Sequence, residues 1–204
     1  MDKRFIEELA SAAPTPGGGA ACAYVGVLAT CLTSMVGNLT VGKERYKNVE
    51  AEAYERLAQL EKLRDRLQKL VGEDEEAFKP LAAAYKMSRG TEEEKAAREK
   101  AIQSSLYEAS EVPLTIMQTI LQALEAARFF AYNGNRSALS DIGAAATFAK
   151  AAAHGVRMTV VANISSMKDE HCQRMYRQRL SALLVEIDRQ ADFVESYVLD
   201  YLSA

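Results

Sequence analysis

The uncharged stretch near the start of the chain constrains the fold more than any other feature. No charged side chain stands between Glu8 and Lys43, and the part over 20–39 is long enough to cross a lipid bilayer as a helix. Its composition argues against lipid contact, because Ala, Gly and Cys dominate where a lipid-facing helix would carry Leu, Ile and Phe. Polar side chains such as Thr30 and Asn38 also interrupt it. We therefore expect a buried central helix of a soluble bundle, with no membrane as partner.

Apolar residues three or four positions apart predict helices along most of the remaining chain. The clearest stripe runs from Tyr46 to Leu70, and Gly72 is expected to interrupt it before a further helical stretch. Thr91 and Glu94 have the spacing of a capping box, which predicts that a new helix begins there.

The second half of the chain also reads as helical. Pro113 is expected to bound or kink a helix, and the Asn-Gly pair at Asn133-Gly134 predicts a helix C-cap and turn because both flanks are helical. The expected helices cover 91–110, 113–132, 137–168 and 170–201. The fold class that follows is all-α, a single-domain up-and-down bundle over 1–204, with 20–39 and 137–168 as its two low-charge central helices.

Charge and cysteine content argue against several classes of protein. The 204 residues carry a net charge of −3, which offers no electrostatic attraction to nucleic acid. Three scattered cysteines fit a reducing compartment, and acidic residues near Met1 break any apolar leader, so we expect a cytoplasmic protein. No CxxC pair exists and only His154 and His171 are present, so neither a bound metal nor a metal cofactor is expected.

Two local features could carry chemistry. Gly17, Gly18 and Gly19 precede the uncharged helix, and either they cradle an anion on backbone N–H groups or they form a tight turn for close packing. Acidic residues at 73–76 follow Gly72, and either they are a solvated helix start or one of them points inward.

Several short motifs follow one another along nearly the whole chain. They are Pro16-Gly17-Gly18-Gly19-Ala20, Gly42-Lys43-Glu44-Arg45-Tyr46, Asp74 with Ala77-Phe78, Gly134-Asn135, Ser140-Asp141 and Val161-Ala162-Asn163-Ile164. Their order and spacing resemble the cyclodeaminase/cyclohydrolase family. This family comprises the cyclodeaminase half of formiminotransferase-cyclodeaminase and stand-alone methenyltetrahydrofolate cyclohydrolases. Ala20 and Cys22 replace residues that are often Ser and Ala in such proteins.

The resemblance implies an all-helical homodimer that acts on a folate without a metal or redox cofactor. It singles out Asp74 as the catalytic acid/base, because the chemistry moves a proton from a nucleophile to a departing nitrogen. Lys43 and Arg45 are expected to hold the glutamate tail of the folate.

The remaining site residues are expected to form the rest of the pocket. Asn135, Asp141 and Asn163 offer donors and acceptors for a reduced pterin, and Gly17, Gly18 and Gly19 would form a wall. For Asp141 a helix-capping role is the alternative.

The implied activity is hydrolysis of 5,10-methenyltetrahydrofolate to 10-formyltetrahydrofolate. One alternative is a formimidoyltetrahydrofolate cyclodeaminase, which closes the methenyl bridge and releases ammonia. A further alternative is a helical folate-binding or adaptor protein without catalysis.

Overall fold

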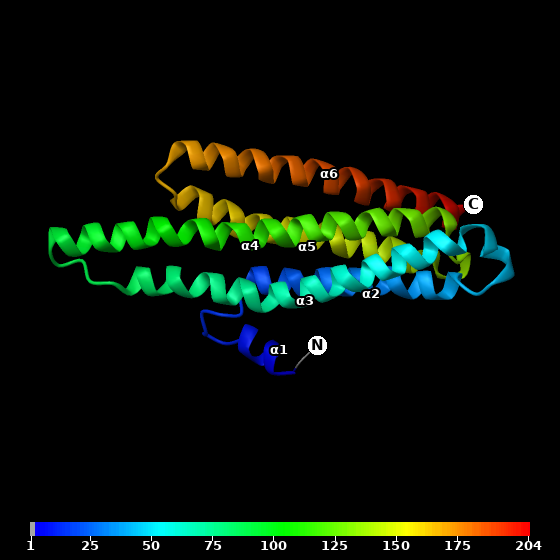
Figure 1. Cartoon of the computed structure of the whole chain (residues 1–204), viewed down its shortest axis with the longest axis horizontal. Coiled ribbons are helices and arrows are strands. Elements are labelled where there is room, and N and C mark those ends of the chain that lie inside the picture. Colours follow the sequence, from blue (N-terminus) through cyan, green and yellow to red (C-terminus); the bar gives the residue numbers. More distant parts are fainter. Residues whose placement is uncertain (1–2) are drawn as a thin grey trace.

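Helices make up every regular element of this computed structural model, which describes residues 3–204, and that range contains no strand. The bounds are α1 (Lys3–Leu9), α2 (Gly18–Thr40), the 3-10 helix η1 (Glu44–Val49), α3 (Glu50–Lys86), α4 (Glu92–Asn133), the 3-10 helix η2 (Arg136–Ala138), α5 (Leu139–Ser166) and α6 (Glu170–Ser203). The long helices α2 to α6 lie side by side and alternate in direction, whereas α1 lies outside them (Figure 1). The predicted all-α bundle is confirmed.

The two low-charge helices pack against each other, as their composition predicted. α2 contacts α3, α4 and α5, and it approaches α5 closely because the residues between them are small. At Gly155 a side-chain Cβ would overlap the Sγ atom of Cys22, so a larger residue there would require the Cys22 side chain to move. Ala23 of α2 and Ala153 of α5 are fully buried.

One face of α2 is covered by the bundle and the opposite face is not. Among the described helices, α2 alone is long and apolar enough to span a membrane, and 56% of its most apolar window is buried inside the protein. Leu28, Met35 and Leu39 are 41%, 40% and 39% exposed on its open side. The covered half therefore serves as core, and an uncharged strip remains at the surface.

Two residues that were expected to mark helix boundaries lie inside helices. α3 continues through Gly72, and α4 continues through Pro113. A glycine or proline inside a helix costs roughly 1–3 kcal/mol, and packing of the flanking residues outweighs that cost. Leu70 and Val71 are buried beside Gly72, and Leu114 is fully buried beside Pro113.

Other predicted boundaries are correct. The Thr91 hydroxyl and the Glu94 carboxylate form the reciprocal capping box at the start of α4. α4 ends at Asn133, and the Gly134 N–H donates to the Phe130 carbonyl as the C-cap.

One predicted helix start is wrong. The long helix expected from Tyr46 begins later, because 44–49 forms the 3-10 helix η1 instead.

Candidate active site

A cavity of about 210 Å³ lies at the N-terminal end of α2. The loop before α2 forms one side of it, and α3, α4 and α5 form the others. Its lining residues are Pro14, Thr15, Gly17, Gly18, Gly19, Asp74, Phe78, Ala109, Thr159 and Asn163. All three glycines of the sequence motif, Asp74 and Asn163 therefore lie in one place.

Asp74 reaches this cavity from the middle of α3. The first helical bond of α2 runs from the Ala21 N–H to the Gly17 carbonyl, so the N–H groups before it lack helical partners. The Ala20 N–H donates to the Asp74 carboxylate. The anion at the start of α2 is thus a carboxylate of the protein itself, placed where the helix dipole stabilises negative charge.

The three glycines differ in what surrounds them. A Cβ on Gly19 would overlap the Asp74 carboxylate, so only glycine allows the two chain segments to come this close. A Cβ on Gly17 or Gly18 would meet no atom within 4 Å. Close packing therefore explains Gly19, whereas Gly17 and Gly18 border open space in the cavity.

Burial raises the pKa of Asp74 from its usual 3.8 to about 6. The hydrogen bond from the Ala20 N–H lowers this pKa and the charge of Glu75 raises it, but both effects are smaller than the effect of burial. A carboxyl group with a pKa of about 6 can both accept and donate a proton near neutral pH.

Cys22 lies close enough to Asp74 to be affected by its charge. Burial, and secondarily Asp74, raise the pKa of the Cys22 thiol. A thiol with a raised pKa is a poor nucleophile at neutral pH, and Cys22 does not line the cavity. Asp74 is the carboxyl group among the lining residues, which suits it to proton transfer.

The neighbouring acidic residues lie outside the cavity. Glu73 pairs with Arg66, and Glu76 pairs with Lys79 at 2.5 Å. Of the four acids at 73–76, only Asp74 lines the pocket. The helix break expected beside it is absent, because α3 is continuous here.

The other predicted binding residues lie at the far end of α2 within one chain. The 23 residues of α2 span about 35 Å, and Lys43 and Arg45 follow its C-terminal end. Asn135 and Asp141 lie in the α4–α5 connection and the first turn of α5 at that same end. None of these four lines the cavity that holds Asp74.

Asn135 has structural partners there. Its backbone N–H donates to the Thr40 hydroxyl at 2.9 Å, its Nδ2 donates to the Leu39 carbonyl at 2.9 Å, and its Oδ1 accepts from the Ser137 N–H. These bonds fasten the α4–α5 turn to the end of α2. Asp141 lies in the first turn of α5, whereas the N-cap position is held by Ala138.

Several residues that line the cavity were not predicted from the sequence, and Thr159 is the most polar of those on a helix. Thr159 lies four positions before Asn163 on α5, which places both side chains on one face of the helix. That spacing from Asn163 was the one signal in the sequence. Phe78 of α3 belongs to a sequence motif but had no predicted role, and it adds an apolar ring to the lining of the cavity.

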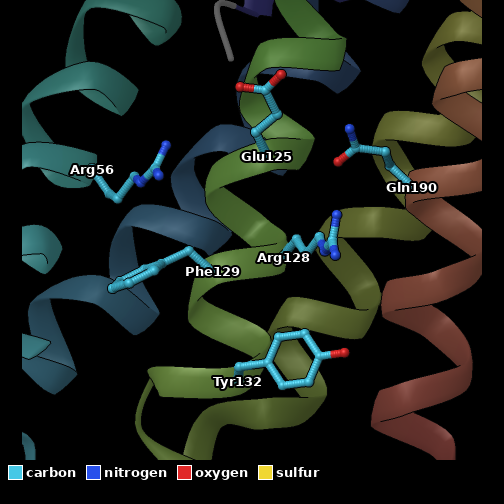
Figure 2. A pocket seen from close by; sticks show the side chains of 6 residues that line it. All are labelled: Arg56, Glu125, Arg128, Phe129, Tyr132 and Gln190. Carbon is cyan, nitrogen blue, oxygen red and sulfur yellow. The ribbon is translucent and has the colours of Figure 1, made fainter.

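A larger groove of about 420 Å³ lies elsewhere, across α3, α4 and α6. Figure 2 shows Arg56 of α3 and Gln190 of α6 on either side of α4. Arg56 lies 5.7 Å from the centre of the Phe129 ring, and Arg128 lies over Phe193. None of the motif residues lines this groove, and Arg56 is about 27 Å from Asp74 along α3.

Within residues 3–204 no group of three or more His, Cys, Asp and Glu side chains is arranged to hold a metal ion.

The chain is similar to known proteins along most of its length. Residues 2–182 match the family model described as formiminotransferase-cyclodeaminase. A methenyltetrahydrofolate cyclohydrolase from Methylorubrum extorquens is 38% identical, over 89% of this chain and 88% of the relative. The formimidoyltransferase-cyclodeaminase of Rattus norvegicus is 32% identical over 94% of this chain, which spans only 36% of that relative.

The fold also has a solved counterpart. The crystal structure of a formiminotetrahydrofolate cyclodeaminase from Thermotoga maritima superposes with a TM-score of 0.88 at 28% identity, and covers 99% of this chain and 98% of that chain.

Proposed function

The chain belongs to the formiminotransferase-cyclodeaminase family, and from this membership we propose that it is a folate enzyme of one-carbon metabolism that hydrolyses 5,10-methenyltetrahydrofolate to 10-formyltetrahydrofolate. The observation that carries the chemistry is Asp74, a carboxyl group with a pKa of about 6 in a cavity walled by glycines.

In the proposed reaction Asp74 acts first as a base and then as an acid. Its carboxylate takes a proton from a water molecule while the oxygen of that water bonds to the methenyl carbon. The resulting tetrahedral intermediate collapses as the bond from this carbon to N5 breaks. Asp74 returns its proton to N5, the former hydroxyl loses its proton to solvent, and the formyl group remains on N10. The carboxylate also stabilises the cationic methenyl bridge before attack.

Similarity favours hydrolysis as the reaction of this chain. The Methylorubrum extorquens cyclohydrolase is 38% identical to this chain, whereas the rat formimidoyltransferase-cyclodeaminase is 32% identical. The higher identity to the cyclohydrolase supports hydrolysis as the first candidate.

Cyclodeamination is the second candidate, and the similarity to the Thermotoga maritima protein supports it. In cyclodeamination N10 of the folate attacks the formimino carbon. Asp74 takes the proton from N10 and gives one to the departing ammonia. The same carboxyl group can serve both reactions, because each moves a proton between a nucleophile and a leaving nitrogen on one carbon.

The purified protein distinguishes these reactions in one experiment with two substrates. Loss of the near-ultraviolet band of 5,10-methenyltetrahydrofolate above the buffer rate supports cyclohydrolase activity. Appearance of that band with ammonia from 5-formimidoyltetrahydrofolate supports cyclodeaminase activity. The absence of reaction with both substrates contradicts the enzyme proposal and favours a folate-binding or adaptor protein.

The uncovered face of α2 supports the expected homodimer. Leu28, Met35 and Leu39 expose apolar surface on a helix with no charged residue, and Phe148 and Met158 extend it on the neighbouring α5. A second copy of the chain can bury this face by the same residues on both sides. Sedimentation of the protein and of a Leu28→Asp variant tests the proposal, because a monomeric wild type would contradict it.

The proposed role of Lys43 and Arg45 requires that dimer. In one chain they lie a whole helix away from Asp74, but a two-fold axis across α2 near Cys31 would bring these residues of the partner subunit to the glycine end. A cavity of about 210 Å³ is smaller than the usual 300–1,000 Å³ of ligand sites, which fits a pocket completed by a partner. Lys43 and Arg45 would then bind the carboxylates of the folate tail.

Mixed dimers test this shared site. Asp74→Asn chains co-expressed with Lys43→Ala/Arg45→Ala chains form hybrid dimers in which one pocket contains all three wild-type residues. Recovery of wild-type KM in the hybrids supports sharing between subunits. Hybrids that show no more activity than the two parent variants added together contradict it.

A further inference from the structure

The hydroxyl group of Thr159 differs from those of the other threonines inside the described helices. Six helical threonines donate to the carbonyl oxygen four residues earlier, which is the usual way to satisfy a hydroxyl in a helix. They are Thr30, Thr33, Thr40, Thr115, Thr119 and Thr147. Thr159 is the exception among the described residues, since its hydroxyl has no partner within the protein, and it lines the cavity. Its hydrogen-bonding capacity is therefore available to a ligand.

Asn163, one turn further along α5, has one end fixed and the other end free. Its Nδ2 donates to the Ala109 carbonyl of α4 at 2.7 Å. In a regular helix that carbonyl would accept from residue 113, but Pro113 has no N–H. Pro113 thus leaves an acceptor that orients the Asn163 amide, and the Oδ1 atom has no hydrogen-bond partner among residues 3–204.

We propose that Thr159 and Asn163 form the edge of the pocket that binds the ring system of the substrate, and that Pro113 is a positioning residue for the Asn163 amide. The edge presents an acceptor, Oδ1, next to a hydroxyl that can donate or accept. A planar ring that carries N–H donors beside a carbonyl oxygen matches this pattern, and Phe78 offers an apolar surface to its face. This proposal rests on the proposed function, which makes the substrate a tetrahydrofolate and its ring system a reduced pterin.

The first test removes the Thr159 hydroxyl without changing the size of the side chain. Thr159→Val should raise KM for 5,10-methenyltetrahydrofolate about five-fold, as expected for one hydrogen bond, with little change in kcat. Thr159→Ser keeps the hydroxyl and should restore KM to near the wild-type value. Thr147→Val, on the same helix but with its hydroxyl already bonded to Gly143 and Glu195, is the matched control and should leave KM unchanged.

The second test separates positioning from stability. Pro113→Ala restores a helical N–H that competes with Asn163 for the Ala109 carbonyl, so KM should rise about three-fold while the melting temperature stays level or increases. A residue with only a structural role would move stability and KM in the same adverse direction. Pro80→Ala is the control, because Pro80 is also inside a helix, whereas the Asn163 amide donates to the carbonyl four residues before Pro113.

A double-variant cycle tests whether Pro113 acts through Asn163. In the Asn163→Ala background, Pro113→Ala should have no further effect on KM. If the effects of the two substitutions on KM simply multiply in the double variant, the positioning role of Pro113 is overturned. Equal KM values for Thr159→Val and Thr147→Val would overturn the role of Thr159.

Binding of tetrahydrofolate, followed by tyrosine fluorescence, keeps this test separate from the proposed reaction. If wild type binds tetrahydrofolate but turns over neither substrate, the proposed function fails while the same variants still test the binding edge through Kd. Absence of both binding and turnover overturns both proposals.

Discussion

The two ends of α2 both carry motifs that stand out in the sequence, yet they differ in how their polar groups are satisfied. At the C-terminal end, Thr40, Asn135 and Tyr46 form hydrogen bonds within the protein. At the N-terminal end, the Thr159 hydroxyl lacks a hydrogen-bond partner among the described residues, and burial raises the pKa of Asp74 to about 6. Satisfied polar groups stabilise a fold, whereas unsatisfied or perturbed groups in a cavity are free to act on a ligand.

The largest expected effect comes from Asp74→Asn at the N-terminal end. We expect turnover to fall about 10³-fold, because the amide cannot carry the proton, while helix content is retained. Steady-state assays and circular dichroism measure the two properties. Activity at the wild-type level would remove Asp74 from the mechanism and would erase the functional difference between the two ends.

The same variant should be more stable than wild type at neutral pH. The folded-state pKa of Asp74 lies above its usual value of 3.8, so its contribution to stability is complete below that pH and is lost as pH rises through about 6. Asp74→Asn should therefore increase the free energy of unfolding at about pH 8 by about 2 kcal/mol, allowing for partial solvent screening, with no gain at about pH 3. Urea unfolding at both pH values checks the sign, and a loss of stability at pH 8 would contradict it.

Gly19→Ala should show the next largest effect. The added methyl group would overlap the Asp74 carboxylate and displace it, which is expected to lower kcat about 10²-fold. Gly18→Ala is the matched comparison, because its Cβ meets no protein atom. That variant should keep kcat and change mainly KM, and equal losses of kcat in both would contradict the distinction between the two glycines.

Asn135→Ala should affect stability and leave the chemistry intact. The variant loses the bonds of the side chain to Leu39 and Ser137, so the free energy of unfolding should fall by about 2 kcal/mol. Urea unfolding measures that loss, and kcat per folded molecule should remain unchanged. A large drop in kcat with unaltered stability would mean that the C-terminal end of α2 takes part directly in the reaction.

The helices were predictable because their signals are local. Apolar spacing, the Thr91–Glu94 capping box and the Asn133-Gly134 turn all appear where the structure has them. The helix ends predicted at Gly72 and Pro113 were wrong, because the sequence shows only the local cost of a helix-breaking residue. The packing that outweighs this cost is contributed by other helices.

The site was predictable only in part. Asp74 stood out from its acidic neighbours through the resemblance to a family, since spacing alone could not show which acid faces inward. Lys43 and Arg45 adjoin the uncharged helix in sequence, but that helix separates them from the cavity in space. Thr159 was overlooked because its distinguishing property is a missing hydrogen bond, which no sequence displays.

The most direct test of the central claim is the pH dependence of kcat/KM for hydrolysis of 5,10-methenyltetrahydrofolate, corrected for the buffer rate at each pH. We expect kcat/KM to fall below an apparent pKa of about 6, where Asp74 becomes protonated, and we expect Asp74→Asn to abolish this transition. A wild-type kcat/KM that stays constant between about pH 5 and about pH 8 would contradict the assignment of Asp74 as the catalytic acid/base. So would a fall in kcat/KM at low pH that persists in Asp74→Asn.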